Sequence, residues 1–320
     1  MPRADYLERE IELRRFLDVQ LEGRYCIPRF YGDKPDFGDM DVLVESQPDW
    51  GERRLELMRA LSVSEFKTAG HVFSVVYRGL QTDFFFVPQR YLESTYTFMS
   101  FNDLGNLLGR MVRRFDLKYG EQGLSYVYRR EESHYKADLE LTQDFGRVCE
   151  FLGLEYARWE AGFDTLESLF EWTIASPYFS VAPYLDDLSG SLERRMKDRP
   201  TIQKFVSWLE HKGISQRPHF EERENYLPLI KATFPEARLE EQIALEQQKE
   251  AQAKDFAAKF SGNLVMRLLP HLQGKALGEF IVALKTSVPH FQEFVLETEQ
   301  DALERYILEF YRIGADGHFS

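Results

Sequence analysis

The sequence predicts an α+β fold, with a small sheet covered by helices on one face and then an all-helical C-terminal domain. The first observation is that short runs of β-branched and aromatic residues, typical of strands, occur at residues 38–44, 72–77 and 81–87. The second is helical spacing of apolar residues before and between these runs, at 5–21 and 52–61. The third is that helical patterns dominate from about residue 137. We therefore predict a domain at 1–135 and another at 136–320, each long enough to bury a core.

The N-terminal elements follow in order. Leu7, Ile11, Leu17 and Leu21 recur at helical spacing in the first helix, and Gly23 fits its C-terminal cap. Residues 24–30 are interpreted as the first strand, with Pro28 restricting it to an edge or a bulge. A turn over 31–38 leads into the strand at 38–44. The runs at 72–77 and 81–87 are joined by a short loop containing Gly79, which predicts a hairpin.

The C-terminal half is expected to be helical. The predicted helices cover residues 103–118, 138–152, 165–175, 201–211 and 236–259. The last is rich in Glu, Gln, Lys and Ala, so it is interpreted as a solvated helix or a small coiled-coil arm. Residues 190–197 are charged and are expected at the surface.

Composition restricts the class of protein. The formal net charge of −13 argues against broad nonspecific nucleic-acid binding, so any nucleic-acid contact requires local basic patches. No apolar run approaches the length of a membrane span, and the first residues lack a signal-peptide pattern. Cys26 and Cys149 lie in apolar surroundings and are interpreted as reduced core residues. These features predict a cytoplasmic protein with no membrane partner.

Three aspartates form the strongest candidate site. Asp39 and Asp41 are two residues apart in a predicted strand, so they point to the same face. Asp83 begins another predicted strand, and pairing of the two strands would bring the three carboxylates together. An Asp-x-Asp at a strand edge is often only solvated surface, but here each strand continues into a buried run. A carboxylate cluster of this density suits Mg²⁺, because like charges repel without a cation.

At these residues the chain resembles a known family. Residues 38–44 are similar to the metal-binding strand of the DNA polymerase beta nucleotidyltransferase superfamily, most closely the family-X DNA polymerases, and Asp83 matches the third metal carboxylate. Residues 96–102 resemble the aromatic turn under the incoming nucleotide, and residues 103–129 resemble the start of the thumb. The resemblance covers roughly residues 5–130. It implies a polymerase-beta-like palm and two Mg²⁺ ions, or Mn²⁺ in their place, held by the three aspartates as catalytic residues.

The resemblance also suggests nucleotide contacts. The family's Gly-Ser pair is missing: this chain has Pro28 and Arg29 near that position. A backbone N–H nest at Gly32 is the alternative phosphate cradle, and Lys34 is the nearest cation in the loop. The full set of predicted nucleotide-binding residues is Gly32, Asp33, Lys34, Gly38, Phe98, Ser100, Asn106 and Arg110.

Acceptor contacts are predicted from two basic features. Arg113, Arg114 and Lys118 accumulate in the second half of the helix predicted at 103–118, followed by Arg129 and Arg130. We interpret this patch as a contact to a phosphate backbone, although capping of the helix dipole is the alternative. The tail around Gly274, Lys275 and Gly278 faintly resembles a G-K-x-L-G element late in tRNA CCA-adding enzymes, or alternatively permits close helix packing.

The predicted activity is transfer of an NMP or dNMP from a nucleoside triphosphate to a hydroxyl, with release of pyrophosphate. A 3′-hydroxyl of nucleic acid, DNA primer or tRNA, is the expected acceptor. The alternative is a toxin-like or resistance-type transferase that nucleotidylates a protein or small molecule. A third hypothesis is a non-catalytic binding module, which three intact carboxylates disfavour.

Overall fold

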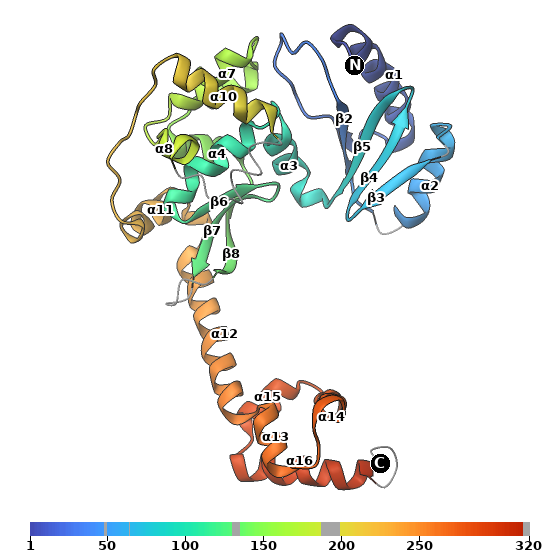
Figure 1. Ribbon diagram of the computed structural model, residues 1–320, viewed down its shortest axis with the longest axis vertical. Helices are drawn as coiled ribbons and strands as arrows, with labels where there is room; N and C mark the ends of the chain where they lie inside the picture. The colour runs from blue at the N-terminus through green and yellow to red at the C-terminus, as the bar shows by residue number, and fades with distance from the viewer. Residues whose placement is uncertain (48–49, 64, 130–134, 187–198, 316–320) are drawn as a thin grey trace. The chain divides into compact units, whose positions relative to one another are not determined.

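The computed structural model describes residues 1–47, 50–63, 65–129, 135–186 and 199–315 (Figure 1). The chain divides into two compact units, Met1–Leu239 and Glu240–Ser320. The predicted α+β class is confirmed: the first unit contains a five-stranded mixed sheet, a three-stranded sheet and many helices, while the described part of the second is helical. None of the helices in these described ranges is both long and apolar enough to cross a membrane.

The five-stranded sheet has the strand order β1-β2-β5-β4-β3. Its strands are β1 (Tyr25–Cys26), β2 (Asp39–Glu45), β3 (Phe66–Ala69), β4 (Val72–Tyr77) and β5 (Leu80–Val87). β2 and β5 run parallel, and the other neighbours are antiparallel. The strand predicted at 24–30 is shorter than expected, because Pro28 has no N–H and the Arg29 N–H donates to Ser100 Oγ.

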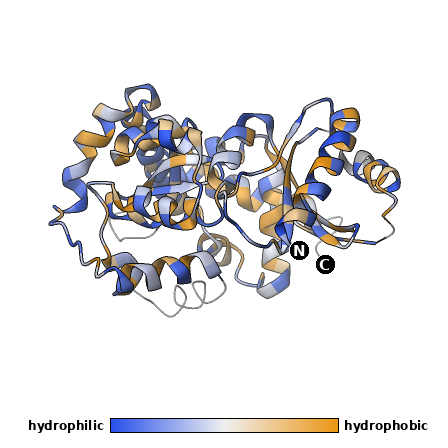
Figure 2. Cartoon of the chain, turned by 90° about the horizontal axis from the view of Figure 1, so that it is seen from above, coloured by the Kyte–Doolittle hydropathy of each residue, from blue (hydrophilic) through white to orange (hydrophobic). Residues whose placement is uncertain are grey.

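One face of this sheet is covered by α1 (Arg3–Leu21) and α2 (Trp50–Ala60). Met40, Val42 and Val44 of β2 point into that core with Leu13 and Leu17 of α1. The buried residues of α1 are Tyr6, Leu13, Leu17 and Leu21, and Figure 2 shows that polar and apolar residues both occur along the helices of the chain. Because side chains alternate along a strand, Asp39 and Asp41 lie on the opposite face of β2.

The rest of the first unit begins with η1 (Gln89–Tyr91) and α3 (Leu92–Met99), which pack near Leu43 and Val87. The three-stranded antiparallel sheet consists of β6 (Leu117–Gly120), β7 (Gly123–Arg129) and β8 (Tyr135–Thr142). The remaining helices are α4 (Leu104–Val112), α5 (Phe145–Leu152), α6 (Tyr156–Ala161), α7 (Leu166–Ile174), α8 (Ala182–Leu185), α10 (Pro200–His211) and α11 (Leu227–Thr233). Short 3₁₀ turns are η2 (Arg113–Phe115), η3 (Arg223–Tyr226) and η4 (Pro235–Ala237).

Two predicted helices are partly wrong. The helix expected at 103–118 ends at Val112, because Asp116 adopts a left-handed φ of 53° after the η2 turn and a strand follows. The helix expected at 138–152 is strand up to Thr142, and α5 starts only after Asp144, whose side chain accepts a hydrogen bond from the Gly146 N–H at 2.7 Å. The segment predicted at 190–197 lies outside the described residues.

The second unit contains α12 (Leu239–Lys259), α13 (Gly262–Leu268), α14 (Gly274–Ser287), α15 (Phe291–Glu297) and α16 (Gln300–Ala315). Its core includes Phe280, Leu284, Val295, Leu303 and Ile307. Most of α12 is exposed, as its polar composition predicts. The unit has its own hydrophobic core.

Candidate functional site

The three predicted aspartates come together on the sheet. β2 and β5 pair in the register that places Asp41 opposite Asp83, and Asp39 lies two residues earlier on the same face. One carboxylate oxygen from each of Asp39, Asp41 and Asp83 can be chosen so that all three lie within 4.8 Å of one another. The alternation argument from the sequence therefore predicted this geometry.

Electrostatic repulsion concentrates on Asp41. The pKa of its carboxyl is raised to about 7, first by burial and then by the charges of Asp39 and Asp83, against an opposing effect of Lys34. The Gln81 amide donates to both carboxylate oxygens of Asp83 at 3.2 and 3.0 Å, which fixes that side chain. Three hard oxygen donors with unrelieved repulsion fit a divalent cation such as Mg²⁺. The donor set is therefore compatible with the predicted metal.

A cavity of about 760 Å³ opens beside Asp39 and Asp41. Its other lining residues are Tyr6, Ile27, Pro28, Arg29, Phe30, Lys34, Phe37, Phe98, Met99, Asn102, Asp103, Asn106, Glu121, Arg199 and Pro200. They come from α1, the segments around β1 and before β2, the end of α3, the start of α4, the turn between β6 and β7, and the start of α10. A cavity of this size accommodates a nucleotide.

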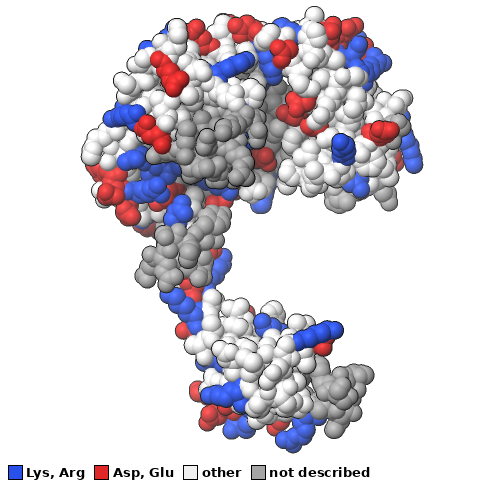
Figure 3. Space-filling model, viewed as in Figure 1, with Lys and Arg blue, Asp and Glu red and all other residues white. Residues whose placement is uncertain are grey.

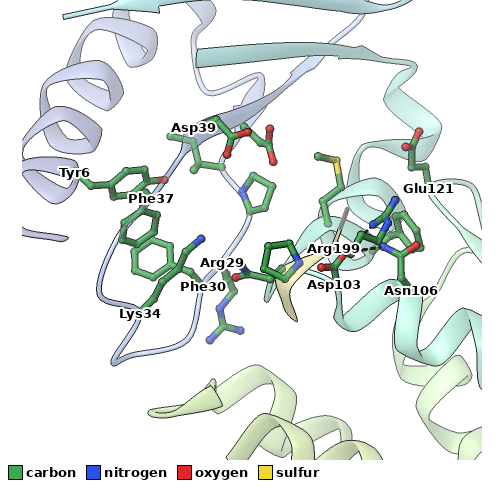
Figure 4. A pocket seen from close by; sticks show the side chains of 17 residues that line it. Tyr6, Arg29, Phe30, Lys34, Phe37, Asp39, Asp103, Asn106, Glu121 and Arg199 are labelled. Atoms are coloured by element: carbon green, nitrogen blue, oxygen red, sulfur yellow. Dashed lines mark hydrogen bonds and ion pairs between the residues drawn. The ribbon is translucent and has the colours of Figure 1, made fainter. Parts of the chain in front are cut away.

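One side of the cavity is aromatic and carries a cation (Figure 4). The Tyr6 and Phe37 rings are stacked with centroids 3.7 Å apart, and Phe30 packs edge-on against both. The Lys34 ammonium lies 4.3 Å from the Phe37 centroid. Burial lowers the pKa of Lys34, although Asp39 and Asp41 oppose this change. Burial, Glu10 and Asp41 raise the pKa of Tyr6, so its hydroxyl remains a hydrogen-bond donor.

The opposite side is a polar cluster around Asp103. Its Oδ1 accepts from the Arg199 guanidinium at 2.6 Å and from the Asn106 amide at 3.3 Å (Figure 4). Phe98 lines the same region. The predicted residues Phe98 and Asn106 therefore lie at the cavity, and so does Lys34, whereas Gly38 precedes β2 with open space around it.

The N–H groups of Gly32 and Asp33, which were predicted to form a phosphate nest, already have partners in the structure. Their backbone N–H groups donate to the carbonyls of Phe163 and Asp164, each at 2.7 Å. A Cβ on Gly32 would lie 2.8 Å from the Asp164 oxygen, so the glycine is required for this close approach. The loop is thus tied to the turn before α7, and these donors are not available to phosphate.

Ser100 and Arg110 also have structural roles that the sequence did not predict. Ser100 is fully buried, accepts from the Arg29 N–H at 3.1 Å and donates to the Tyr96 carbonyl at 2.7 Å. The Arg110 guanidinium is buried and donates to the Pro183 carbonyl at 3.2 Å, and burial lowers its pKa. Neither side chain is among the residues described as lining the cavity.

Two cations of the predicted acceptor patch, Lys118 and Arg129, have acidic partners. Lys118 pairs with Asp138 at 2.5 Å, and Arg114 lies 4.4 Å from the Phe220 centroid, while Arg113 is exposed. Arg129 pairs with Asp116 at 3.4 Å, and Arg130 lies outside the described residues. On the face in Figure 3, acidic and basic residues are interspersed rather than segregated.

In the second unit, Lys275 is highly exposed and lies 3.5 Å from Glu279. A Cβ added to Gly278 would have no neighbour within 4 Å, so close packing does not explain this glycine. Gly274 has a positive φ of 54° at the start of α14. The phosphate-binding turn predicted here remains a prediction.

Sequence reasoning missed several residues that line the cavity: Tyr6, Phe30, Phe37, Asp103 and Arg199. Tyr6 fits the apolar stripe of α1 and Arg199 precedes a helix in a distant part of the sequence, so no local signal marks either. Arg29 was noted only as a departure from the family. Its guanidinium donates to the Trp159 carbonyl at 3.0 Å and is directed away from Asp39 (Figure 4).

The chain was compared with protein-family models, curated proteins and solved structures, and only solved structures match it. No protein-family model and no curated protein matches the chain. The solved structures similar to it include Leishmania infantum polymerase beta in a ternary P/T complex, with 15% identity, 49% of this chain and 74% of that chain covered, and a TM-score of 0.37. A ternary gap complex of the same polymerase has 16% identity, a TM-score of 0.34 and coverage of 41% of this chain and 53% of that chain, about half its length.

Proposed function

We propose that this protein is a metal-dependent nucleotidyltransferase of the DNA polymerase beta type, which moves an NMP or dNMP from a nucleoside triphosphate to a hydroxyl. The observation that carries the proposal is the convergence of Asp39, Asp41 and Asp83 within 4.8 Å beside a nucleotide-sized cavity. The resemblance of residues 38–44 and of Asp83 to the metal-binding strands of that superfamily supports it.

Each side chain has a role in this proposal. Asp39 and Asp41 would hold one divalent cation, and together with Asp83 they would hold a second. When bound, the ions neutralise phosphate charge and lower the pKa of the hydroxyl. Asp83 accepts the hydroxyl proton as the oxygen attacks the α-phosphorus and the bond to pyrophosphate breaks. Lys34, Phe98 and Asn106 line the space for the nucleotide, with Gly38 leading into the strand.

The acceptor we propose is a nucleic-acid 3′-hydroxyl, a DNA primer or tRNA end, with Arg113 and Lys275 as exposed cations for its backbone. A protein or small-molecule hydroxyl is the second candidate. The observation that favours it is the ion pairing of Lys118 and Arg129, which reduces the charge of the predicted patch.

The direct test supplies each labelled nucleoside triphosphate with Mg²⁺ and measures incorporation into DNA, tRNA and protein. We expect Asp39→Ala, Asp41→Ala and Asp83→Ala each to abolish transfer, while Asp255→Ala, which removes an exposed carboxylate on α12, leaves it unchanged. Substantial transfer by Asp83→Ala at saturating Mg²⁺ would show that the three carboxylates do not act together.

A further inference from the structure

Tyr6 presents an unpartnered hydroxyl at the cavity. The side chain is 3% exposed and lines the cavity together with Asp39 and Asp41. Its hydroxyl forms no hydrogen bond with any group in the described part of the chain, and it is not one of the fully enclosed polar atoms there, so it is open to the cavity. A hydroxyl donor that faces a polar cavity without a protein partner is available to a ligand. Stacking on Phe37 at 3.7 Å restricts the ring to this position.

The positively charged ammonium of Lys34 lies on the same side of the cavity as Tyr6. Its ammonium lies over the Phe37 ring, at 4.3 Å from the centroid, so both Tyr6 and Lys34 are positioned by one aromatic side chain. No ion pair to Lys34 occurs within the residues the structure describes. Figure 4 shows the Tyr6, Phe37 and Lys34 side chains next to one another, with Asp39 close by.

Several other groups near the aspartates that could bind an anion already have partners within the described residues. The N–H groups of Gly32 and Asp33 donate to backbone carbonyls, and Ser100 Oγ is buried with its own partners. The Arg29 guanidinium is held by the Trp159 carbonyl. The Arg199 guanidinium is paired with Asp103 on the opposite side.

We propose that the Tyr6 hydroxyl and the Lys34 ammonium bind the phosphate tail of the nucleotide, in place of the backbone nest that this fold's loop does not provide. This inference rests on the proposed function for the identity of the ligand. Phosphate oxygens accept from both groups: the hydroxyl donates a directed hydrogen bond and the ammonium adds a positive charge. Both groups contact the Phe37 ring, which holds them on the same side of the cavity.

The experiment measures binding of inorganic triphosphate with Mg²⁺ to the full chain by titration calorimetry. Tyr6→Phe removes only the hydroxyl and keeps the stack on Phe37, and Lys34→Met keeps the aliphatic stem. Loss of one hydrogen bond to a charged acceptor weakens binding roughly ten- to a hundredfold, so we expect a decrease of this size for each variant. The control is Tyr25→Phe, which removes a hydroxyl bound to Asp18 at 2.7 Å away from the cavity.

Two further measurements show whether Tyr6→Phe acts through the structure rather than through the lost hydrogen bond. If only the hydrogen bond is lost, the Mg²⁺ affinity and the melting temperature of Tyr6→Phe both equal those of the parent. Triphosphate affinity unchanged in Tyr6→Phe would overturn the assignment, as would a parent protein that does not bind triphosphate. Failure of the proposed function is seen separately: in that case the parent transfers no nucleotide, whatever its affinity for triphosphate. Selective loss of triphosphate binding in both variants supports the proposal.

Discussion

Replacement of Asp41 by Asn should stabilise the metal-free protein at neutral and alkaline pH. The carboxyl is surrounded by Asp39 and Asp83, and its pKa rises from 3.8 to about 7, with burial as the largest cause. The folded state therefore retains a proton that the unfolded chain has lost, so this group's contribution to stability is largest below pH 3.8 and falls as the pH rises toward about 7. Above that pH the contribution is constant.

The size of the stabilisation follows from the pKa shift of Asp41. About three pKa units at about 1.4 kcal/mol each give an upper limit of about 4 kcal/mol. Solvent reaches part of the Asp41 side chain, so we expect Asp41→Asn to gain about 2–4 kcal/mol at pH 8. A domain of this size gains roughly 2–4 °C in melting temperature per kcal/mol, which corresponds to roughly 5–15 °C. At pH 4 the parent and the variant should melt close together.

The assay is thermal unfolding followed by circular dichroism from pH 4 to 9 with a chelator present. Asp255→Asn is the control, because that carboxylate is exposed on α12 and belongs to no comparable acidic cluster among the described residues. If Asp41→Asn melts like the parent at pH 8 as well as at pH 4, then burial and the neighbouring carboxylates do not raise the pKa of Asp41 as the structure indicates.

Three further outcomes are expected. Arg110→Met should lower the free energy of unfolding by about 1–3 kcal/mol, because the Pro183 carbonyl loses its donor; urea titration measures this, and a loss of nucleotide affinity without a loss of stability would contradict it. Gly32→Ala should cost about 1–3 kcal/mol in the same assay, because its Cβ would meet the Asp164 oxygen at 2.8 Å, and a neutral result would mean the loop adapts freely. Gly278→Ala should instead gain about 0.5–1 kcal/mol, since the site is open and helical, and destabilisation there would reveal a contact that the geometry does not show.

Local alternation was sufficient to predict the carboxylate site. Asp39, Asp41 and Asp83 each belong to a strand whose period of two fixes the face of the side chain, and only one pairing was needed to bring them together. The predicted hairpin and the helices at the N-terminus were confirmed for the same reason: their signals lie within a few residues.

The features that could not be predicted from the sequence depend on contacts between segments that are far apart in the chain. Gly32 is a plausible phosphate cradle by sequence, but its N–H is taken by Phe163, far along the chain. Arg110 has the polarity of a surface cation, yet Pro183 gives it a buried partner. Tyr6 fits the core stripe of a helix, and only the tertiary fold shows that its hydroxyl reaches a cavity. Periodicity cannot reveal such pairings.

The parallel pairing of β2 with β5 also has a consequence for folding. The two strands are separated in sequence by α2 and by β3 and β4, so their contacts require closure of a long loop and are expected to form slowly. A slip of β5 by one residue would turn Asp83 toward the face packed by α1 and α2. The carboxylate cluster therefore exists only when the strands have reached their final register. A ligand that requires all three carboxylates would stabilise the correctly paired chain over every slipped alternative.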